Sequence, residues 1–382
     1  MKKIIVFLII GVLFSKSEIT LYNLQSIIFE DGGFVFCPTF NEVGDILAIE
    51  KWKGSDGLQT WLIDINKIEN KFPIKKSNKS KKPLHCGGIK WSKANPEIAF
   101  VEAILSRKTR FYQVNYRNLL AHDKTYMDEW SDNIFGISSF GNEIHSYSLA
   151  EYGGEDIVIF CYHDKEAKKD KYGIYSDGAR EILLPELEDP FVQMEINNID
   201  DGYLSLIKTD SANNPEIILL EDPIDDVETQ VTISPYQYDQ IVYEKKININ
   251  TSDNTYLSYL AKEQQNKMEK VASLYLVEDP FVNTKGKKIA ESVHIVDKGT
   301  ERLLNFNHQW HPEYNIVFYI KRQQDLNDKF VLYAYDVENE IELAVTSDLE
   351  GIQHLAISAD GKKIALCGIK SGSLWIADLI IN

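Results

Sequence analysis

Short runs of apolar residues alternate with turn residues along most of this chain, and the clearest example stands near its C-terminal end. Residues 357–366 place an Asp-Gly turn at 360–361 before an apolar run, and residues 373–379 add a further apolar run that includes Asp378. Asp-Gly turns supply the positive φ of a tight hairpin, and β-branched and aromatic runs suit a pleated, packed surface. The segment therefore predicts consecutive antiparallel strands.

The same pattern returns at intervals of about 50 residues, which is typical of a repeat architecture. The clear copies begin at Phe40, Trp91, Trp310 and Ile357, and weaker copies fill the middle, with turn residues near Gly154, Gly202 and Asn254. Seven copies fit best, and six remains the alternative because the middle copies are degenerate. The Trp residues at 61, 91, 310 and 375 are predicted core, and Asp64, Asp336 and Asp378 are predicted to fix turns after third strands.

Each copy predicts a four-stranded antiparallel sheet, which cannot bury both faces unless its neighbours stack on it. Radial stacking of such sheets produces a propeller. The predicted fold class is therefore all-β, one closed β-propeller of seven four-stranded blades over residues 18–382, with six blades as the alternative. The last copy ends soon after its third strand, so we expect residues 19–24 to pair with 374–379. This pairing would join both ends of the chain in one blade and remove an open edge.

Residues 1–17 have the pattern of a secretory signal peptide. Lys2 and Lys3 precede an apolar run at 4–14, and Ser15-Lys16-Ser17 forms a small-x-small site. The run is short beside the roughly 20 residues of a membrane-spanning helix, although an uncleaved membrane anchor is the alternative. We therefore expect cleavage after Ser17 and a periplasmic or secreted protein.

The net charge of the chain limits the kinds of molecule that it is expected to bind. The chain has a net charge of −17, whereas nucleic-acid binding needs a positive surface. Nucleic acid is therefore excluded as the expected partner. The basic cluster at 75–82 is interpreted as a solvated loop, with a docking patch as the alternative.

Four cysteines are few for an exported protein stapled by disulfides. Cys161 and Cys367 each end an apolar run and are predicted to be buried. Cys37 and Cys86 occupy similar points of neighbouring repeats, so whether they form a bridge stays open. No Cys-x-x-Cys pair occurs, and zinc-finger spacing is absent.

The pattern Ser-x-Asp-Gly-Lys-x-Ile-Ala at 358–365, followed by Leu-Trp-Ile-x-Asp-Leu at 374–379, resembles the TolB-type propeller repeat, a relative of the WD repeat. Residues 40–49, 91–100 and 310–319 carry the pattern in part. The resemblance implies the propeller alone, without the α/β domain that precedes it in TolB. It also implies a periplasmic or secreted interaction module, although a fold by itself does not define a function.

The favoured function is a non-catalytic, monomeric binding module without a cofactor. One mouth of the propeller channel would receive a protein or peptide partner, in association with an envelope complex. The alternative is a metal-dependent, carbohydrate-active enzyme. It rests on histidines that precede predicted inner strands: His85, His145, His308 and His354. A ring of imidazoles suits a transition metal, and the arrangement resembles the metal site of oligogalacturonate-lyase-type propellers.

The default interpretation of these four histidines is that they are solvated or hydrogen-bonded at strand ends and bind no metal. Their distances from the repeat starts differ, so they do not share one height along the channel. His311, which precedes Pro312, is predicted to cap its own turn.

Overall fold

The computed structural model describes residues 18–54, 57–74, 86–105, 108–116, 127–129, 143–152, 155–176, 181–183, 193–200, 203–209, 215–221, 229–233, 247–249, 256–261, 271–280, 282–294, 308–323, 329–345, 349, 351–368 and 372–382. The predicted signal peptide at 1–17, the whole basic cluster at 75–82 and His85 lie outside these residues. The predictions about these segments therefore stay predictions.

The strands of the first half form antiparallel sheets of four, each in chain order. The first contains β2 (Phe34–Phe40), β3 (Ile46–Trp52), β4 (Leu58–Asp64) and β5 (Lys71–Pro73). The second contains β6 (Cys86–Trp91), β7 (Ile98–Leu105), β8 (Lys108–Asn115) and β9 (Met127–Glu129). The third contains β10 (Glu143–Tyr152), β11 (Glu155–Asp164), β12 (Lys169–Ser176) and β13 (Glu181–Leu183). The fourth contains β14 (Gln193–Asp200), β15 (Tyr203–Thr209), β16 (Pro215–Glu221) and β17 (Thr229–Ile233).

The next two sets of four strands are joined into one eight-stranded sheet. The first set is β18 (Ile247–Ile249), β19 (Tyr256–Ala261), β20 (Val271–Glu278) and β21 (Lys287–His294). The second is β22 (His308–Trp310), β23 (Ile316–Gln323), β24 (Lys329–Asp336) and β25 (Ile341–Ala344). Among the described residues, the strand pairing between β21 and β23 is limited to Val293 and Lys321.

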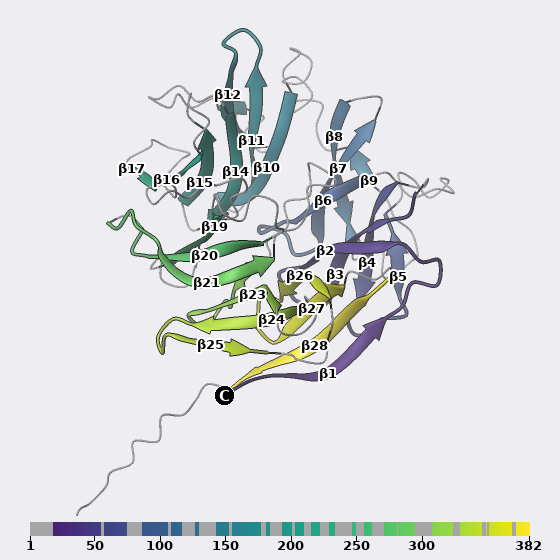
Figure 1. The fold of residues 1–382 in the computed structure, drawn as a ribbon. Coiled ribbons are helices and arrows are strands. Elements are labelled where there is room, and N and C mark those ends of the chain that lie inside the picture. The colour runs from purple at the N-terminus through teal and green to yellow at the C-terminus, as the bar shows by residue number, and fades with distance from the viewer. Residues whose placement is uncertain are drawn as a thin grey trace, which may run out of the picture.

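The last sheet combines both ends of the described chain. It has the order β1-β28-β27-β26, with β1 (Ile19–Ile27), β26 (Ile352–Ile357), β27 (Lys363–Gly368) and β28 (Leu374–Ile381). β1 runs antiparallel to β28, from Ile19 opposite Ile381 to Ile27 opposite Leu374. The predicted pairing of residues 19–24 with 374–379 is confirmed, and Figure 1 shows the two strands side by side.

One contact in this sheet corrects a prediction about Asp378. Asp64 and Asp336 do fix turns, since Asp64 accepts the N–H of Asn66 at 2.9 Å and Asp336 that of Asn339 at 3.1 Å. Asp378 instead lies within β28, because that strand continues in order to pair with β1. Its carboxylate accepts hydrogen bonds from the Asn23 amide of β1 at 2.6 Å and from the Lys363 ammonium of β27 at 3.0 Å.

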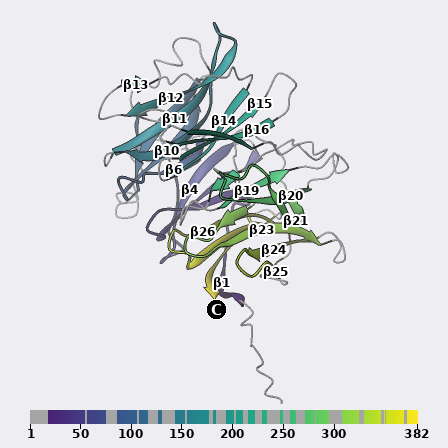
Figure 2. The ribbon, with the colours of Figure 1, turned by 90° about the vertical axis from the view of Figure 1, so that its left-hand side faces the viewer.

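The sheets follow one another in space in the order of the chain. Figure 1 shows the colours passing from β2–β5 through β10–β12 and β20–β25 to β26–β28, and Figure 2 shows the same succession from the side. From β6 onward the first strands of consecutive sheets are in contact, and β26 contacts both β22 and β2, whereas β6 contacts β3 and β4 of the first sheet. The architecture is all-β, with sheets that meet through their first strands.

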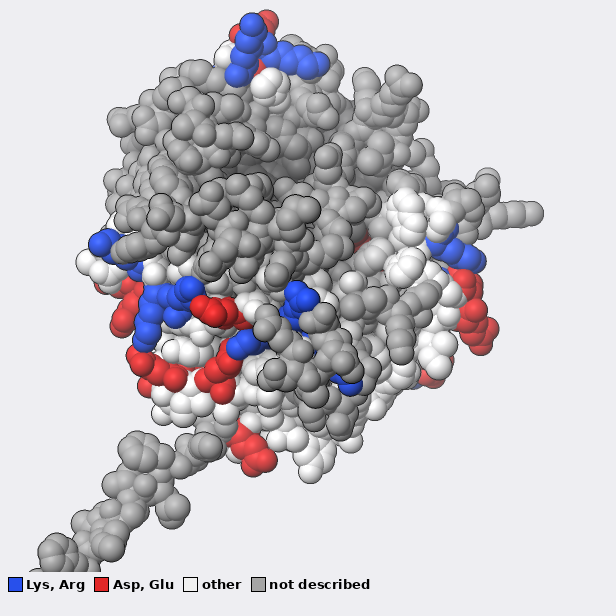
Figure 3. Space-filling view, in the orientation of Figure 1, with Lys and Arg blue, Asp and Glu red and all other residues white. Residues whose placement is uncertain are grey.

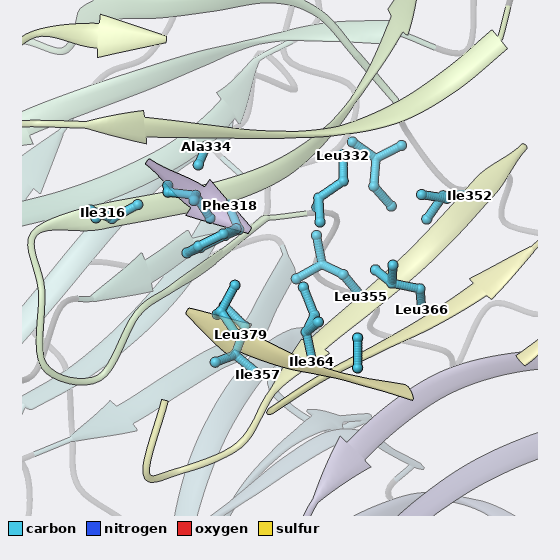
Figure 4. Close-up of a cluster of buried hydrophobic side chains, with 13 residues drawn as sticks. Ile316, Phe318, Leu332, Ala334, Ile352, Leu355, Ile357, Ile364, Leu366 and Leu379 are labelled. Atoms are coloured by element: carbon cyan, nitrogen blue, oxygen red, sulfur yellow. The ribbon is translucent and has the colours of Figure 1, made fainter. Parts of the chain in front are cut away.

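The hydrophobic core lies between neighbouring sheets. In Figure 4, Phe318 and Leu332 of the β22–β25 set face Leu355, Ile364 and Leu366 of the last sheet. All five are nearly inaccessible to solvent, and burying one such side chain contributes about 1.5–3 kcal/mol. Equivalent clusters lie between other consecutive sheets. Stacking therefore buries both faces of the β2–β5 sheet, of the β18–β21 and β22–β25 sets and of the last sheet, as the repeat pattern predicts.

A capping side chain follows the first strand in the clear repeats. Asn41 accepts the N–H of Ile46 through Oδ1 at 2.9 Å. Ser358 accepts the N–H of Lys363 through Oγ, also at 2.9 Å. Both bonds span the tight turn that reverses the chain into the second strand, and both satisfy a backbone donor there.

Ser92 and His311 occupy the same position and cap the turn through donors two or three residues away. Ser92 Oγ accepts the N–H of Asn95 at 2.7 Å. His311 Nδ1 accepts the N–H groups of Glu313 and Tyr314 at 3.1 and 3.2 Å. The prediction that His311 caps its turn is confirmed.

Cys37 and Cys86 are not joined by a disulfide. Cys86 lies against β4, where its thiol is 3.5 Å from Thr60 Oγ1. β4 is two strands from β2, which carries Cys37, and two strand spacings of about 4.8 Å exceed the Cα reach of a disulfide. Burial raises the pKa of the Cys86 thiol to about 11.

Candidate functional site

The first strands of several sheets carry a β-bulge. The pairing with the following strand shifts by one residue in β2, β6, β10, β14 and β26. A bulge bends the strand and changes the direction of the extra side chain, and bulges are common beside functional sites. Because the first strands contact one another between sheets, the bulges lie along the region where the sheets meet.

Two of the four predicted metal ligands lie on neighbouring first strands. His308 begins β22 opposite Tyr319, and His354 lies in β26 opposite Cys367. Both imidazoles are buried, and β22 contacts β26. The ring of Phe36 from β2 meets His354 edge-on, with 6.1 Å between centroids. These two histidines are therefore packed between sheets.

The other two predicted ligands are described incompletely or not at all. His145 is the extra residue of the bulge in β10, but its side chain is outside the described part, as is all of His85. Within the described part of the chain, no group of three or more His, Cys, Asp or Glu side chains is arranged to hold a metal ion. The four-histidine site thus stays a prediction.

A groove of about 740 Å³ lies between the β18–β21 set and the β22–β25 set. This volume falls within the range of about 300–1,000 Å³ that is typical of ligand sites. Its lining combines tyrosines, carboxylates, lysines and apolar side chains: Tyr256, Leu276, Glu278, Val282, Asn283, Thr284, Lys285, Lys287, Tyr335, Val337, Glu338 and Glu340.

Tyr256 at one end of the groove is held in place by the neighbouring set. Its ring stacks on Trp310 of β22, with 5.9 Å between centroids and 20° between the planes. The Trp310 indole N–H in turn donates to Ser258 Oγ of β19 at 2.9 Å. Tyr256 lies directly opposite Glu278 in the pairing of β19 with β20, so their side chains share one face.

Two carboxylates give this end of the groove a negative field. Burial raises the pKa of the Tyr256 phenol, and the charges of Glu278 and Glu338 raise it further. Glu338 lies in the turn after β24, where Asn315 donates to its carboxylate at 3.4 Å. Tyr256 therefore shares the groove with two acidic side chains that come from different sets of strands.

The loop between β20 and β21 forms one wall of the groove. Asp279 has a positive φ of 49°, and its carbonyl accepts the N–H groups of Val282 and Asn283 at 2.9 and 2.8 Å. The Asn283 amide donates to the carbonyl of Glu278 at 2.8 Å. A side chain at Gly286 would collide with the Tyr259 ring, so this glycine allows the loop to lie directly on β19.

An ion pair connects the two walls. Lys287 at the start of β21 lies 2.7 Å from Glu340 in the turn after β24. Lys287 donates a hydrogen bond to Glu340, and this bond raises the pKa of Lys287, although both side chains are largely exposed. Figure 3 shows acidic and basic side chains intermixed over β20–β25 on this face of the described chain. The groove thus has two parts. At one, the charges of Lys287 and Glu340 offset each other, and at the other Tyr256 lies with the carboxylates of Glu278 and Glu338.

Sequence reasoning did not find this groove. Tyr256 and Trp310 are interpreted from sequence as strand residues of separate repeats, and nothing in either repeat predicts that their rings stack. The usable signal was the charged, polar segment 278–288 after the strongly apolar run at 271–277. Such a segment marks a surface loop, but its partner wall comes from the next repeat.

Comparisons with solved structures identify the architecture. The Dos1 propeller is 11% identical in sequence, with a TM-score of 0.56 over 94% of this chain and 95% of that chain. An oligogalacturonate lyase from Vibrio parahaemolyticus is 8% identical, with a TM-score of 0.58 over 95% of this chain and 98% of that chain. This chain has a β-propeller fold. At these identities the likeness shows the propeller fold alone.

The propeller fold that the TolB-type repeat pattern implied is thereby confirmed. TolB from Acinetobacter baumannii is also similar, at 8% identity and a TM-score of 0.47 over 90% of this chain and 66% of that chain. No family profile matches the sequence of the propeller, and no curated protein matches it. Among the residues that the structure describes, no helix is long and apolar enough to cross a membrane.

Proposed function

We propose that the chain is a closed, seven-bladed, monomeric propeller that binds a segment of a partner protein without catalysis. Its described strands fall into seven sets of four, which supports seven blades over six. The contact of β26 with β2 and the sharing of the last sheet by β1 and β28 support a closed ring. A closed ring leaves a rigid scaffold whose turns and inter-blade grooves are available for binding.

The groove between the fifth and sixth blades carries the binding proposal. Its walls mix tyrosine, apolar and charged side chains, and protein interfaces are enriched in tyrosine around a polar rim. Val282 on its rim is 73% exposed, so it offers an apolar contact to a partner in the groove. The net charge of −17 favours a protein over nucleic acid as the partner.

We also propose that the protein acts in the periplasm or at the cell envelope, in association with an envelope complex. The charged, apolar and small-residue pattern of residues 1–17 supports export. Cell fractionation of the full chain, with immunoblotting of each fraction, tests this point. Recovery of the uncleaved chain in the cytosolic fraction would contradict it.

Peptide display on the purified protein tests the binding proposal. Random peptides are selected, and their affinities are then measured calorimetrically for the wild type, Val282→Asp and Val43→Asp. Val43 is the matched control, because it is 55% exposed but lies in the turn after β2, away from the groove. We expect Val282→Asp to weaken the selected peptides by ~10-fold or more and Val43→Asp to leave them unchanged. Failure to select any peptide, or equal binding by Val282→Asp, would reject the proposal.

A metal-dependent, carbohydrate-active enzyme is the second candidate. The buried positions of His308 and His354 on contacting strands favour it, together with the fold shared with an oligogalacturonate lyase. Elemental analysis of the purified protein decides the metal question: a stoichiometric transition metal that His308→Ala removes supports the enzyme. Incubation with oligogalacturonate, followed by absorbance of unsaturated uronate products, decides the reaction. A metal-free protein that forms no such product excludes this candidate.

A further inference from the structure

We propose that the Tyr256 end of the groove binds a cationic side chain, a lysine ammonium or an arginine guanidinium, of the partner segment. This inference rests on the proposed binding function and deepens it. Tyr256, Glu278 and Glu338 would form the site: the ring supplies a π face, and the two carboxylates supply charge on either side. Cations bind over aromatic faces and pair with carboxylates, so the three groups select the same ligand.

The position of Tyr256 is set before any ligand arrives. One face of its ring is covered by Trp310, whose indole is itself held by Ser258 at 2.9 Å. The ring still lines the groove and remains partly exposed, which leaves part of it available to a ligand. A fixed aromatic ring loses little conformational freedom on binding, which favours recognition.

The distribution of charge separates this end from the rest of the groove. Lys287 is engaged by Glu340 at 2.7 Å, so that lysine is neutralised locally. Among the described residues, neither Glu278 nor Glu338 forms an ion pair. Lys285 also lines the groove, but the charges that act on the Tyr256 phenol are those of Glu278 and Glu338. A cation entering here thus meets two carboxylates that no described ion pair engages, although Asn315 donates a hydrogen bond to Glu338 at 3.4 Å.

Fluorescence anisotropy with defined peptides tests the inference. The probe is a labelled hexapeptide of alternating Arg and Ala, and the matched peptide replaces each Arg with Gln. The protein variants are the double change Glu278→Gln with Glu338→Gln, the single change Tyr256→Leu, and the control Glu291→Gln. Glu291 is also an exposed carboxylate of this blade, but it pairs with Lys288 outside the groove. All titrations use one salt concentration, because the net charge attracts any cation.

We expect the Arg peptide to bind the wild type and the Gln peptide to bind at least ~10-fold more weakly. The double variant should lose ~10-fold in affinity, and Tyr256→Leu ~3-fold, while Glu291→Gln retains the wild-type value. Near-UV circular dichroism confirms that the isosteric Glu→Gln variants keep their tertiary packing. Equal losses in the double variant and in Glu291→Gln would overturn the site in favour of general attraction by the net charge.

The failure of this inference can be told apart from the failure of the proposed function. Display-selected peptides that depend on Val282 but lack Lys and Arg would overturn the cationic site and leave the binding function intact. If no peptide depends on Val282 and the Arg peptide does not bind, both proposals are rejected.

Discussion

Gln309 holds both backbone groups of Ile357. The N–H of Ile357 donates to Gln309 Oε1 at 2.9 Å, and Gln309 Nε2 donates to the carbonyl of Ile357 at 3.4 Å. The two residues belong to β22 and β26, the first strands of the sixth and seventh sets. A first strand has one edge without a ladder partner, so this side chain replaces the missing strand pairing.

Replacing Gln309 should therefore loosen the junction between these sets. We expect Gln309→Leu to lower the free energy of unfolding by about 1–3 kcal/mol, because two partly buried backbone groups lose their partner. Gln309→Glu should also destabilise, since a carboxylate cannot donate to the carbonyl of Ile357. Urea unfolding followed by tryptophan fluorescence measures both. The control is Gln25→Leu on the exposed face of β1, and an equal loss there would contradict the explanation.

Lys51 is a buried cation that depends on Asp31. Its side chain is 1% exposed, forms an ion pair with Asp31, and lies 4.9 Å from the ring centroids of both Phe29 and Trp61. Removing the partner of a buried charge costs more than removing the charge itself. We expect Asp31→Asn to cost about 3 kcal/mol and Lys51→Met distinctly less. Thermal unfolding of the two variants gives the order, and the reverse order would show that the ammonium does not need the carboxylate.

The same ion pair predicts that the free energy of unfolding decreases at acidic pH. Burial acts to raise the pKa of Asp31, but the hydrogen bond and charge of Lys51, with help from Lys53, outweigh it and hold that pKa below its ordinary value. A lowered carboxyl pKa contributes stability that is present above about pH 4 and is lost as the pH falls through the folded-state value. Asp31→Asn should reduce the pH dependence of the unfolding free energy measured between about pH 5 and 2.

Gly361 and Gly44 occupy equivalent turns, so alanine substitutions at the two positions can be compared directly. Both have positive φ, 68° and 77°, so an alanine at either position meets the same backbone cost of about 1 kcal/mol. A side chain at Gly361 would also collide with the imidazole of His311, whereas at Gly44 the nearest atom is the Ser358 Cβ at 3.5 Å. We expect Gly361→Ala to lower Tm clearly more than Gly44→Ala. Equal shifts in a calorimetric scan would show that the imidazole moves aside at no cost.

His311 should make stability fall on mild acidification. Its Nδ1 accepts two backbone N–H groups, so Nε2 carries the proton and donates to the carbonyl of Gly361 at 3.1 Å. Burial lowers the pKa of this imidazole, against smaller opposing contributions from Gly361, Glu313 and Asp360. The rings of Tyr314 and Phe318 also pack on it.

The sign of the effect follows from which state binds the proton first. An unfolded histidine takes up its proton near pH 6.5, whereas folded His311 does so only at lower pH. The unfolded state therefore binds more protons below about pH 6.5, and unfolding becomes easier as the pH falls. His311→Asn should keep a turn cap, as Asn41 does in the first repeat, and should reduce the pH slope. An unchanged slope between about pH 6.5 and 5 would assign it to another group.

Much of this architecture could be predicted because its causes are local. Asp360-Gly361 forms a tight turn through the φ of one glycine, and the apolar runs around it form strands through their own alternation. The pairing of β1 with β28 also followed from counting, because the last repeat had three strands and an unassigned apolar segment stood at 19–24. His311 was assigned to its turn because the capped donors lie two and three residues away.

Contacts between repeats were not predictable in the same way. The possible bridge between Cys37 and Cys86 failed because equivalent positions in neighbouring sheets do not face each other, and the Cys86 thiol meets β4 instead. Asp378 was assigned to a turn because Asp64 and Asp336 occupy the equivalent position after a third strand, whereas β28 continues past Asp378 to pair with β1.

The sequence by itself determined the repeats, their strands and turns, and the segment that completes the last sheet. Each of these depends on residues that are close in the chain or on the number of strands in a repeat. Only the tertiary structure decided which side chains meet between sheets: the contacts of Lys51 with Asp31, Phe29 and Trp61, the hydrogen bonds of Gln309 to Ile357, and the groove that Tyr256 shares with Glu278 and Glu338. These contacts depend on how one twisted sheet packs on the next, and alternation within a single strand does not encode that packing.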